Sequence, residues 1–180
     1  MVVALESSRA PDYGRLKEYA PFSFTIEETG GIIGNGDITM DWIVHVLKRT
    51  VDTQYRTKAD RRHTFLAGSS MGGLMTLYGL LAYPEVFSRG AALSPSLWID
   101  AEKVKAMIRH ARVKRNTVLY MDYGALEFAD HPHSRSLFAE VSALLIEKRV
   151  LLNSRIVPRG THCEASWEKQ IPFFMKTLFE

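Results

Sequence analysis

The chain has 180 residues, of which 46% are hydrophobic and 24% are charged, and its net charge is +3. This length and composition are ordinary for one soluble globular domain with a real core, which we expect to span residues 1–180. The basic residues are scattered and not laid along one face between aromatic residues, so a nucleic-acid partner is disfavoured. No stretch approaches a membrane span, and no group of His, Cys and Asp has the spacing of metal ligands, so we expect no membrane partner, metal or other cofactor.

The two remaining clues to cellular location are the N-terminus and the cysteine count. Met1–Leu5 has no basic lead and no cleavage site, so the sequence shows no export signal. The single Cys163 excludes an internal disulfide and is typical of a reducing compartment. A cytoplasmic location is therefore expected.

The first third of the chain is expected to contain one strand and one helix. Met1–Leu5 is entirely apolar and predicts a buried strand, and a polar connection over residues 6–24 follows it. Residues 28–36 are rich in glycine but lack the Lys-Ser/Thr of a phosphate-binding loop, so a flexible loop is predicted. Asp37 is the expected cap of a helix that runs to about Thr53.

The rest of the chain alternates between apolar runs and helical patterns. Further strands are predicted at residues 63–67, 87–93, 116–122 and 151–157, and helices at residues 74–83, 101–110, 132–148 and 164–179. Strands that are continuous apolar runs, separated by helices, are typical of a parallel sheet covered on both faces. The sequence therefore predicts an α/β fold.

The segment Gly68–Gly73 (Gly-Ser-Ser-Met-Gly-Gly) lies between a predicted strand and a predicted helix. This is the context of the G-x-S-x-G nucleophile elbow, with Ser70 at its apex. A strand that turns into a helix within one residue strains the backbone at that residue, and Gly68 and Gly72 would leave room for the turn. Ser69 lies one position too early to be the nucleophile, so Ser70 is the candidate.

A serine hydroxyl needs a base, and His162 is the best placed of the six histidines. It follows the last predicted strand in a short loop with glycine, at the sheet edge where the chemistry of parallel sheets collects. His131 and His133, in a loop after the preceding strand, remain open alternatives. The other three lie in or near helices or at the wrong end of a strand, and we expect them to be structural or solvated: His45, His63 and His110.

The acid that orients the histidine should come from the loop after the strand that precedes the His162 strand. Glu127 lies a few residues into that loop and could reach sideways to the imidazole. Asp122, at the end of the strand, is the second candidate, although it could instead brace the loop. The chain order Ser70, Glu127, His162 is the order of the α/β-hydrolases.

With these residues in place, the chain resembles the esterase branch of the α/β-hydrolase superfamily that includes enterochelin (trilactone siderophore) esterases, esterase D and feruloyl esterases. The resemblance rests on segments that span nearly the whole chain, at residues 15–21, 55–57, 68–74, 83–87, 94–98, 123–127 and 160–162. It implies an α/β-hydrolase fold in which Ser70 is the nucleophile, His162 the base and Glu127 the acid. It also implies that Trp98 and Trp167 line or back the acyl pocket, and Ser69 joins Trp98 as a candidate substrate-binding residue.

The chain departs from that family at its N-terminus. Family members carry further N-terminal strands, one of which lies beside the nucleophile strand and supplies an oxyanion amide; this sequence lacks them. The amide of Met71 remains as one donor of the oxyanion hole. We expect either that Met1–Leu5 moves into the vacant position or that a second chain covers the edge, which predicts a homodimer or a higher homo-oligomer.

These observations predict a serine carboxylesterase that acts on short-chain or aryl esters as its small-molecule substrates. A trilactone siderophore esterase is the first alternative, and Arg9, Arg15 and Arg159 could contribute to the basic pocket that such a substrate favours. The second alternative is a catalytically weak, truncated relative that serves as a binding or assembly module.

Overall fold

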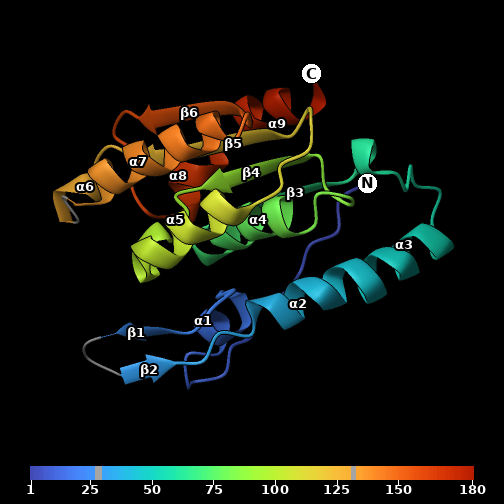
Figure 1. Ribbon diagram of the computed structural model, residues 1–180, viewed down its shortest axis with the longest axis horizontal. Coiled ribbons are helices and arrows are strands. Elements are labelled where there is room, and N and C mark those ends of the chain that lie inside the picture. Colours follow the sequence, from blue (N-terminus) through green and yellow to red (C-terminus); the bar gives the residue numbers. More distant parts are fainter. Residues whose placement is uncertain (27–29, 131–132) are drawn as a thin grey trace.

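The fold is that of a parallel sheet with helices on both faces, as a computed structural model shows (Figure 1); residues 1–26, 30–130 and 133–180 are described. Neighbouring strands pair in parallel in the order of the chain. They are β3 (Phe65–Ser69), β4 (Arg89–Leu93), β5 (Val118–Gly124) and β6 (Leu151–Val157). The α/β prediction is confirmed, and these strands match the last four that the sequence predicts.

Alternate residues of the central strands face two different layers of helices. Ala92 and Met121 belong to the larger core, whereas Ala91 and Tyr120 pack with Leu178 on the opposite face of the sheet. Figure 1 shows the corresponding arrangement of the helices around the sheet. One layer contains α4 (Met71–Ala82), α5 (Ala101–His110) and α7 (His133–Glu147), and the other contains α8 (Glu164–Glu168) and α9 (Ile171–Phe179).

Two of these helices come from one predicted helix. The pattern over residues 164–179 predicts a continuous helix, but α8 ends at Glu168 and α9 begins at Ile171. Pro172 lies in the first turn of α9, where its missing N–H costs nothing. Inside a continuous helix the same proline would remove a hydrogen bond, so the break falls just before it.

The N-terminal part of the chain holds more structure than the sequence predicts. A short helix and an antiparallel hairpin lie in segments that we expected to be irregular, although residues 27–29 fall outside the described part. The elements are α1 (Gly14–Tyr19), β1 (Phe24–Ile26), β2 (Gly30–Ile32), α2 (Gly36–Trp42), a π-helical turn (Ile43–Leu47) and α3 (Lys48–Gln54). Asn35, and not Asp37, is the N-cap of α2; Asp37 lies in the first turn, where a carboxylate favours the helix dipole.

Shorter elements complete the description. They are the 3₁₀ turns Arg61–His63 and Leu97–Ile99, and the one-turn helix α6 (Glu127–Asp130). None of the helices in the described ranges combines the length and the apolar character that a bilayer crossing requires. The same residues contain no cluster of His, Cys, Asp and Glu that could hold a metal ion.

The prediction of a strand at Met1–Leu5 is wrong. The segment has no regular structure, and Met1 and Val2 are 74% and 88% exposed. An apolar run becomes a strand only where a neighbouring strand supplies hydrogen bonds, and in the described part β3 pairs with β4 alone. Met1–Leu5 therefore does not fill the position beside β3, which is an edge strand.

The alternation of the backbone identifies which groups of β3 face the free edge. The N–H of Ser70 donates to the carbonyl of Leu93 in β4, at 2.9 Å. Residues two apart in a strand point the same way, so the N–H and C=O groups of Phe65, Ala67 and Ser69 point away from β4. These groups are available to a further strand.

Candidate active site

The turn between β3 and α4 holds Ser70 in a backbone conformation that L-residues rarely adopt, with φ 56° and ψ −120°. A Cβ atom on Gly68 would lie 2.5 Å from the carbonyl of Gly72, so glycine is required there. The expectation that Gly72 also makes room is wrong, because a Cβ on Gly72 meets nothing within 4 Å. Gly73 is the second tight position, since its Cβ would lie 3.0 Å from the carbonyl of Leu93.

The structure brings Ser70, His162 and Glu127 together in one chain of hydrogen bonds. Nε2 of His162 lies 3.0 Å from the hydroxyl of Ser70, and Nδ1 lies 2.7 Å from Oε2 of Glu127. A carboxylate can only accept, so Nδ1 donates and Nε2 is free to accept the Ser70 proton. The three side chains come from the N-cap of α4, the loop after β6 and the first residue of α6.

Glu127 is 8% exposed, and every part of its carboxylate is occupied. Oε1 accepts the N–H of Gly124 and the hydroxyl of Ser94, both at 2.7 Å, while Oε2 faces His162. Burial alone raises the pKa of Glu127, but the hydrogen bonds from His162, Ser94 and Gly124 outweigh it, so the pKa lies below its ordinary value. The carboxylate is therefore held in its charged form beside the imidazole.

Asp122, the alternative acid, occupies a different place. It is 1% exposed, and it accepts hydrogen bonds from the N–H of Ser94 at 3.2 Å and from the hydroxyl of Tyr120 at 2.7 Å. Burial raises the pKa of Asp122, which sets it apart from Glu127. From its position near the end of β5, Asp122 braces the chain around Ser94.

Three other histidines have local partners on or near their own elements. His45 pairs with Asp41, His63 pairs with Asp60, and His110 contacts the carbonyl of Ala106. These contacts agree with the expectation that these three histidines are structural or solvated. His131 lies outside the described residues, and His133 begins α7.

The remaining candidate residues surround the turn to different degrees. Met71 is the first residue of α4, where backbone N–H groups have no partner within the helix. Ser69 ends β3, while Trp98 lies in the 3₁₀ turn after β4 and is 52% exposed. Trp167 lies on α8 with its indole N–H 2.9 Å from the hydroxyl of Ser94. The exposure of Trp98 shows that it is not part of the hydrophobic core.

Ser94 and Ser96 were not singled out as site residues from the sequence. The buried hydroxyl of Ser96 lies 3.3 Å from that of Ser70, and the hydroxyl of Ser94 donates to Glu127. The signal that could have found them is position: a Ser-Pro-Ser segment directly follows β4, the neighbour of the strand β3 that leads to Ser70. The carboxyl ends of adjacent parallel strands meet at one edge of a sheet.

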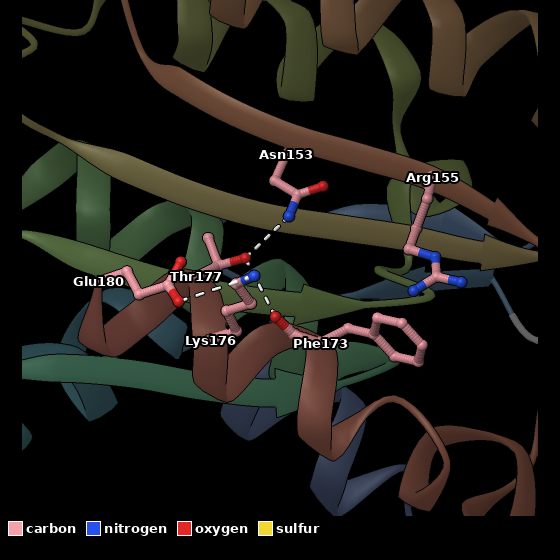
Figure 2. Close-up of a pocket in the computed structure, with 6 residues that line it drawn as sticks. All are labelled: Asn153, Arg155, Phe173, Lys176, Thr177 and Glu180. Atoms are coloured by element: carbon pink, nitrogen blue, oxygen red, sulfur yellow. Dashed lines mark hydrogen bonds and ion pairs between the residues drawn. The ribbon is translucent and has the colours of Figure 1, made fainter.

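A separate hollow of about 450 Å³ lies between β6 and α9 (Figure 2). It shares no residue with the Ser70 site, and its polar groups largely pair with one another. Asn153 donates to the hydroxyl of Thr177, Lys176 pairs with Glu180, and the Arg155 guanidinium covers the ring of Phe173. The lining residues are Asn153, Arg155, Phe173, Lys176, Thr177 and Glu180. Nothing in this lining resembles an activated nucleophile.

Comparison with known proteins points to one family. A family model described as "Putative esterase" matches residues 33–175. The iron(III) salmochelin esterase of Escherichia coli O6:H1 is 35% identical over 78 residues, which are 43% of this chain and 19% of that protein. The matched region of this family model includes all three members of the hydrogen-bonded chain.

Among the solved structures that share the fold are two that align with 91% of this chain. The BES protein from Bacillus cereus has a TM-score of 0.73 at 17% identity, with 91% of this chain and 62% of that chain covered. An IroE-like serine hydrolase from Shewanella oneidensis has a TM-score of 0.72 at 19% identity, with 91% of this chain and 55% of that chain covered. This chain therefore spans less than two thirds of the length of each of these relatives.

Proposed function

Because the chain belongs to the Putative esterase family, we propose that it is a serine carboxylesterase that hydrolyses short-chain or aryl carboxylic esters. The observation that carries the proposal is the chain of hydrogen bonds from Ser70 through His162 to Glu127. A hydroxyl within 3.0 Å of an imidazole that a buried carboxylate orients is the arrangement of an activated serine nucleophile.

The proposed reaction has two halves. In the first, Oγ of Ser70 attacks the ester carbonyl while Nε2 of His162 takes the hydroxyl proton, and the alcohol then leaves with that proton. In the second, His162 removes a proton from water, the hydroxide attacks the acyl group, and the acid leaves as Ser70 regains its proton. Glu127 stays ionised throughout and stabilises the imidazolium.

The negative oxygen of each tetrahedral intermediate needs hydrogen-bond donors. We assign one of them to the N–H of Met71, at the positive end of α4. With the N–H of Met71 as the one assigned donor, the oxyanion hole would have one backbone donor fewer than is usual, and loss of one donor typically costs about 100 to 1000-fold in rate. A weakly active binding or assembly module is therefore the rival function, favoured by the open edge of β3.

A fluorophosphonate probe distinguishes the two functions. The esterase proposal expects covalent labelling of Ser70 in the folded protein, loss of labelling in Ser70→Ala, and loss of p-nitrophenyl acetate hydrolysis in the same variant. A folded wild-type protein that does not label would rule the enzyme out. If Ser70→Ala hydrolysed p-nitrophenyl acetate as fast as wild type, the active site would lie elsewhere.

A trilactone siderophore is the second candidate substrate, favoured by the salmochelin esterase to which this chain is similar. Arg15 and Arg159 could recognise such an acidic substrate, whereas Arg9 is already paired with Glu6. Esters graded by acyl length, tested beside a cyclic trilactone, separate the two substrate classes. The short-chain proposal expects kcat/KM to fall as the acyl group lengthens and to be lowest for the trilactone.

We also propose that a second copy of the chain covers the edge of β3, so that the protein is a homodimer. The support is the row of outward N–H and C=O groups at Phe65, Ala67 and Ser69, because an unprotected edge strand pairs readily with another strand.

A cytoplasmic location is proposed as well, since the free Cys163 suits a reducing compartment; cell fractionation tests it.

A further inference from the structure

Ser94 is held at the junction between β4 and Pro95 in a strained conformation. Its φ is 41°, in the left-handed region, although it is not glycine, and it is 1% exposed. Its N–H donates to the backbone carbonyl of Asp122 at 3.0 Å and to the Asp122 side chain at 3.2 Å. Strain that the surroundings maintain so closely is a reason to look for function at this residue.

The hydroxyl of Ser94 lies between an indole and a carboxylate. Nε1 of Trp167 is 2.9 Å from Oγ of Ser94, and the same oxygen is 2.7 Å from Oε1 of Glu127. An indole N–H can only donate, and an ionised carboxylate can only accept. The single proton of Ser94 must therefore point at Glu127, and the direction of both hydrogen bonds is fixed.

Trp167 also contacts His162, the hydrogen-bond partner of Glu127. Its ring meets the imidazole of His162 edge to face, with ring centroids 4.9 Å apart and planes at 83°. Trp167 lies five positions after His162, on α8, and the hydroxyl of Ser166 on the same helix accepts the N–H of Thr161 at 3.0 Å. One aromatic side chain thus contacts His162 directly and reaches Glu127 through Ser94.

We propose that Trp167 and Ser94 are positioning residues, which hold the Glu127 carboxylate and the His162 imidazole in the arrangement that activates Ser70. This inference rests on the esterase function proposed above and assigns roles to two residues within it. The indole polarises the Ser94 hydroxyl, which strengthens the hydrogen bond from that hydroxyl to the carboxylate. The ring edge limits rotation of the imidazole about its own side chain.

The test measures kcat/KM for p-nitrophenyl acetate in Ser94→Ala, Trp167→Phe and their double variant. Alanine keeps the steric demand of a Cβ at position 94 and removes only the hydroxyl. Phenylalanine keeps an aromatic ring at position 167 and removes the N–H together with the second ring of the indole. We expect about a 10 to 100-fold loss in Ser94→Ala, the rate equivalent of one hydrogen bond to a charged group. Trp167→Phe should lose less, because its N–H acts through Ser94.

The double variant decides whether Trp167 and Ser94 act through one connected series of hydrogen bonds to Glu127. If the indole N–H works through the Ser94 hydroxyl, Trp167→Phe costs nothing further in the Ser94→Ala background. Independent losses that multiply would overturn the proposal. The control is Ser88→Ala, which removes a buried serine hydroxyl that has no hydrogen-bond partner in the described residues and should leave kcat/KM unchanged.

The titration of Glu127 itself separates positioning from a general loss of structure. Removal of the Ser94 donor should raise the pKa of Glu127, so the carboxyl resonance of Glu127, followed by NMR, should titrate at higher pH in Ser94→Ala than in wild type. A Glu127 titration that is the same in both proteins would contradict the proposal. Fluorophosphonate labelling of the wild type is done first: if Ser70 does not label, the esterase function itself fails, and the roles of these two residues are decided only when it does.

Discussion

At the scale of single residues, the candidate site lies beside two buried carboxylates that differ in their partners. Glu127 has three hydrogen-bond donors, one of them the imidazole of His162, and its pKa is lowered. Asp122 lies nearby, is bonded to Ser94 and Tyr120, and its pKa is raised by burial. Environments that shift the pKa values of two carboxyl groups in opposite directions indicate which of the two stays charged, and here that group is Glu127, the partner of His162.

Replacement of the acid should therefore identify it. In Glu127→Gln the amide cannot stabilise the imidazolium as a carboxylate does, so we expect kcat for p-nitrophenyl acetate to fall by several orders of magnitude, on the order of 10⁴-fold as in other serine triads. Asp122→Asn is the matched comparison and should lose far less, since Asp122 touches Ser94 and not His162. A larger loss in Asp122→Asn would transfer the acid role to that residue.

The same pair predicts opposite dependences of stability on pH. The pKa of Glu127 is depressed in the folded state, so its stabilising contribution is present above the ordinary value of 4.5 and is lost as pH falls through the folded pKa. In urea unfolding, wild type should have a larger free energy of unfolding than Glu127→Gln at pH 7, and this difference should disappear below about pH 4.5. A gap that is constant with pH would contradict the lowered pKa.

For Asp122 the sign reverses. Its folded pKa is raised, so protonation favours the folded state, and wild type should gain stability relative to Asp122→Asn as pH falls toward the ordinary value of 3.8. The two comparisons are made on the same buffers and serve as controls for each other.

At the scale of elements, the turn from β3 to α4 concentrates the geometric demands on a few backbone atoms. Ser70 is strained, Gly68 lies against the carbonyl of Gly72, and Gly73 approaches the end of β4. The positive φ of Ser70 lifts its hydroxyl toward His162, and α4 starts at the next residue. The close approach of the two backbones at Gly68 is thus part of what forms the site.

Two glycine substitutions in this turn should differ sharply. In Gly68→Ala the new methyl group would lie 2.5 Å from backbone atoms of Gly72, so the turn must shift; we expect a loss of about 1 to 3 kcal/mol in unfolding free energy, and loss of fluorophosphonate labelling. In Gly72→Ala the methyl group meets nothing within 4 Å, and the unfolding free energy should stay within about 0.5 kcal/mol of wild type. Equal destabilisation of both variants would show that the contact at Gly68 is not what limits the turn.

At the scale of the whole molecule, β3, the strand that leads to the proposed nucleophile Ser70, lies at an edge of the described sheet. β3 pairs with β4 on one side, and the backbone of Phe65, Ala67 and Ser69 faces outward on the other. The chain also covers less than two thirds of the length of its relatives. Whatever pairs with β3 would end beside Ser70 if it ran parallel to it, so coverage of this edge and completion of the site are linked.

The proposed homodimer is tested by blocking that edge. Ala67→Pro removes an N–H that points away from β4 and removes no hydrogen bond to β4. The fold should therefore survive, while pairing of β3 with a strand of the second copy is lost. We expect wild type to sediment as a dimer and Ala67→Pro as a monomer with an unchanged far-ultraviolet circular dichroism spectrum. Ala67→Ser keeps the N–H and should remain dimeric. A wild-type protein that is monomeric at high micromolar concentration would end the dimer proposal.

The sequence alone was sufficient for the α/β class, for four strands and for selecting Ser70, Glu127 and His162 as candidates, which the structure brings within hydrogen-bond distance. Buried parallel strands appear as apolar runs, and the elbow at Ser70 needs glycine at fixed positions, so local chemistry encodes both. Glu127 and His162 each follow the end of a strand in the chain. Because neighbouring parallel strands end at the same edge of the sheet, the two side chains come together there.

Only the tertiary structure decided the rest. Met1–Leu5 has the composition of a strand, but a strand also needs a neighbour, and neighbours are not encoded locally. The contact between Glu127 and His162 depends on how the loops after β5 and β6 are placed, which the sequence does not give. The contact of Ser94 with Trp167 joins residues 73 positions apart, which no spacing rule connects, because it depends on how α8 packs against the end of β4.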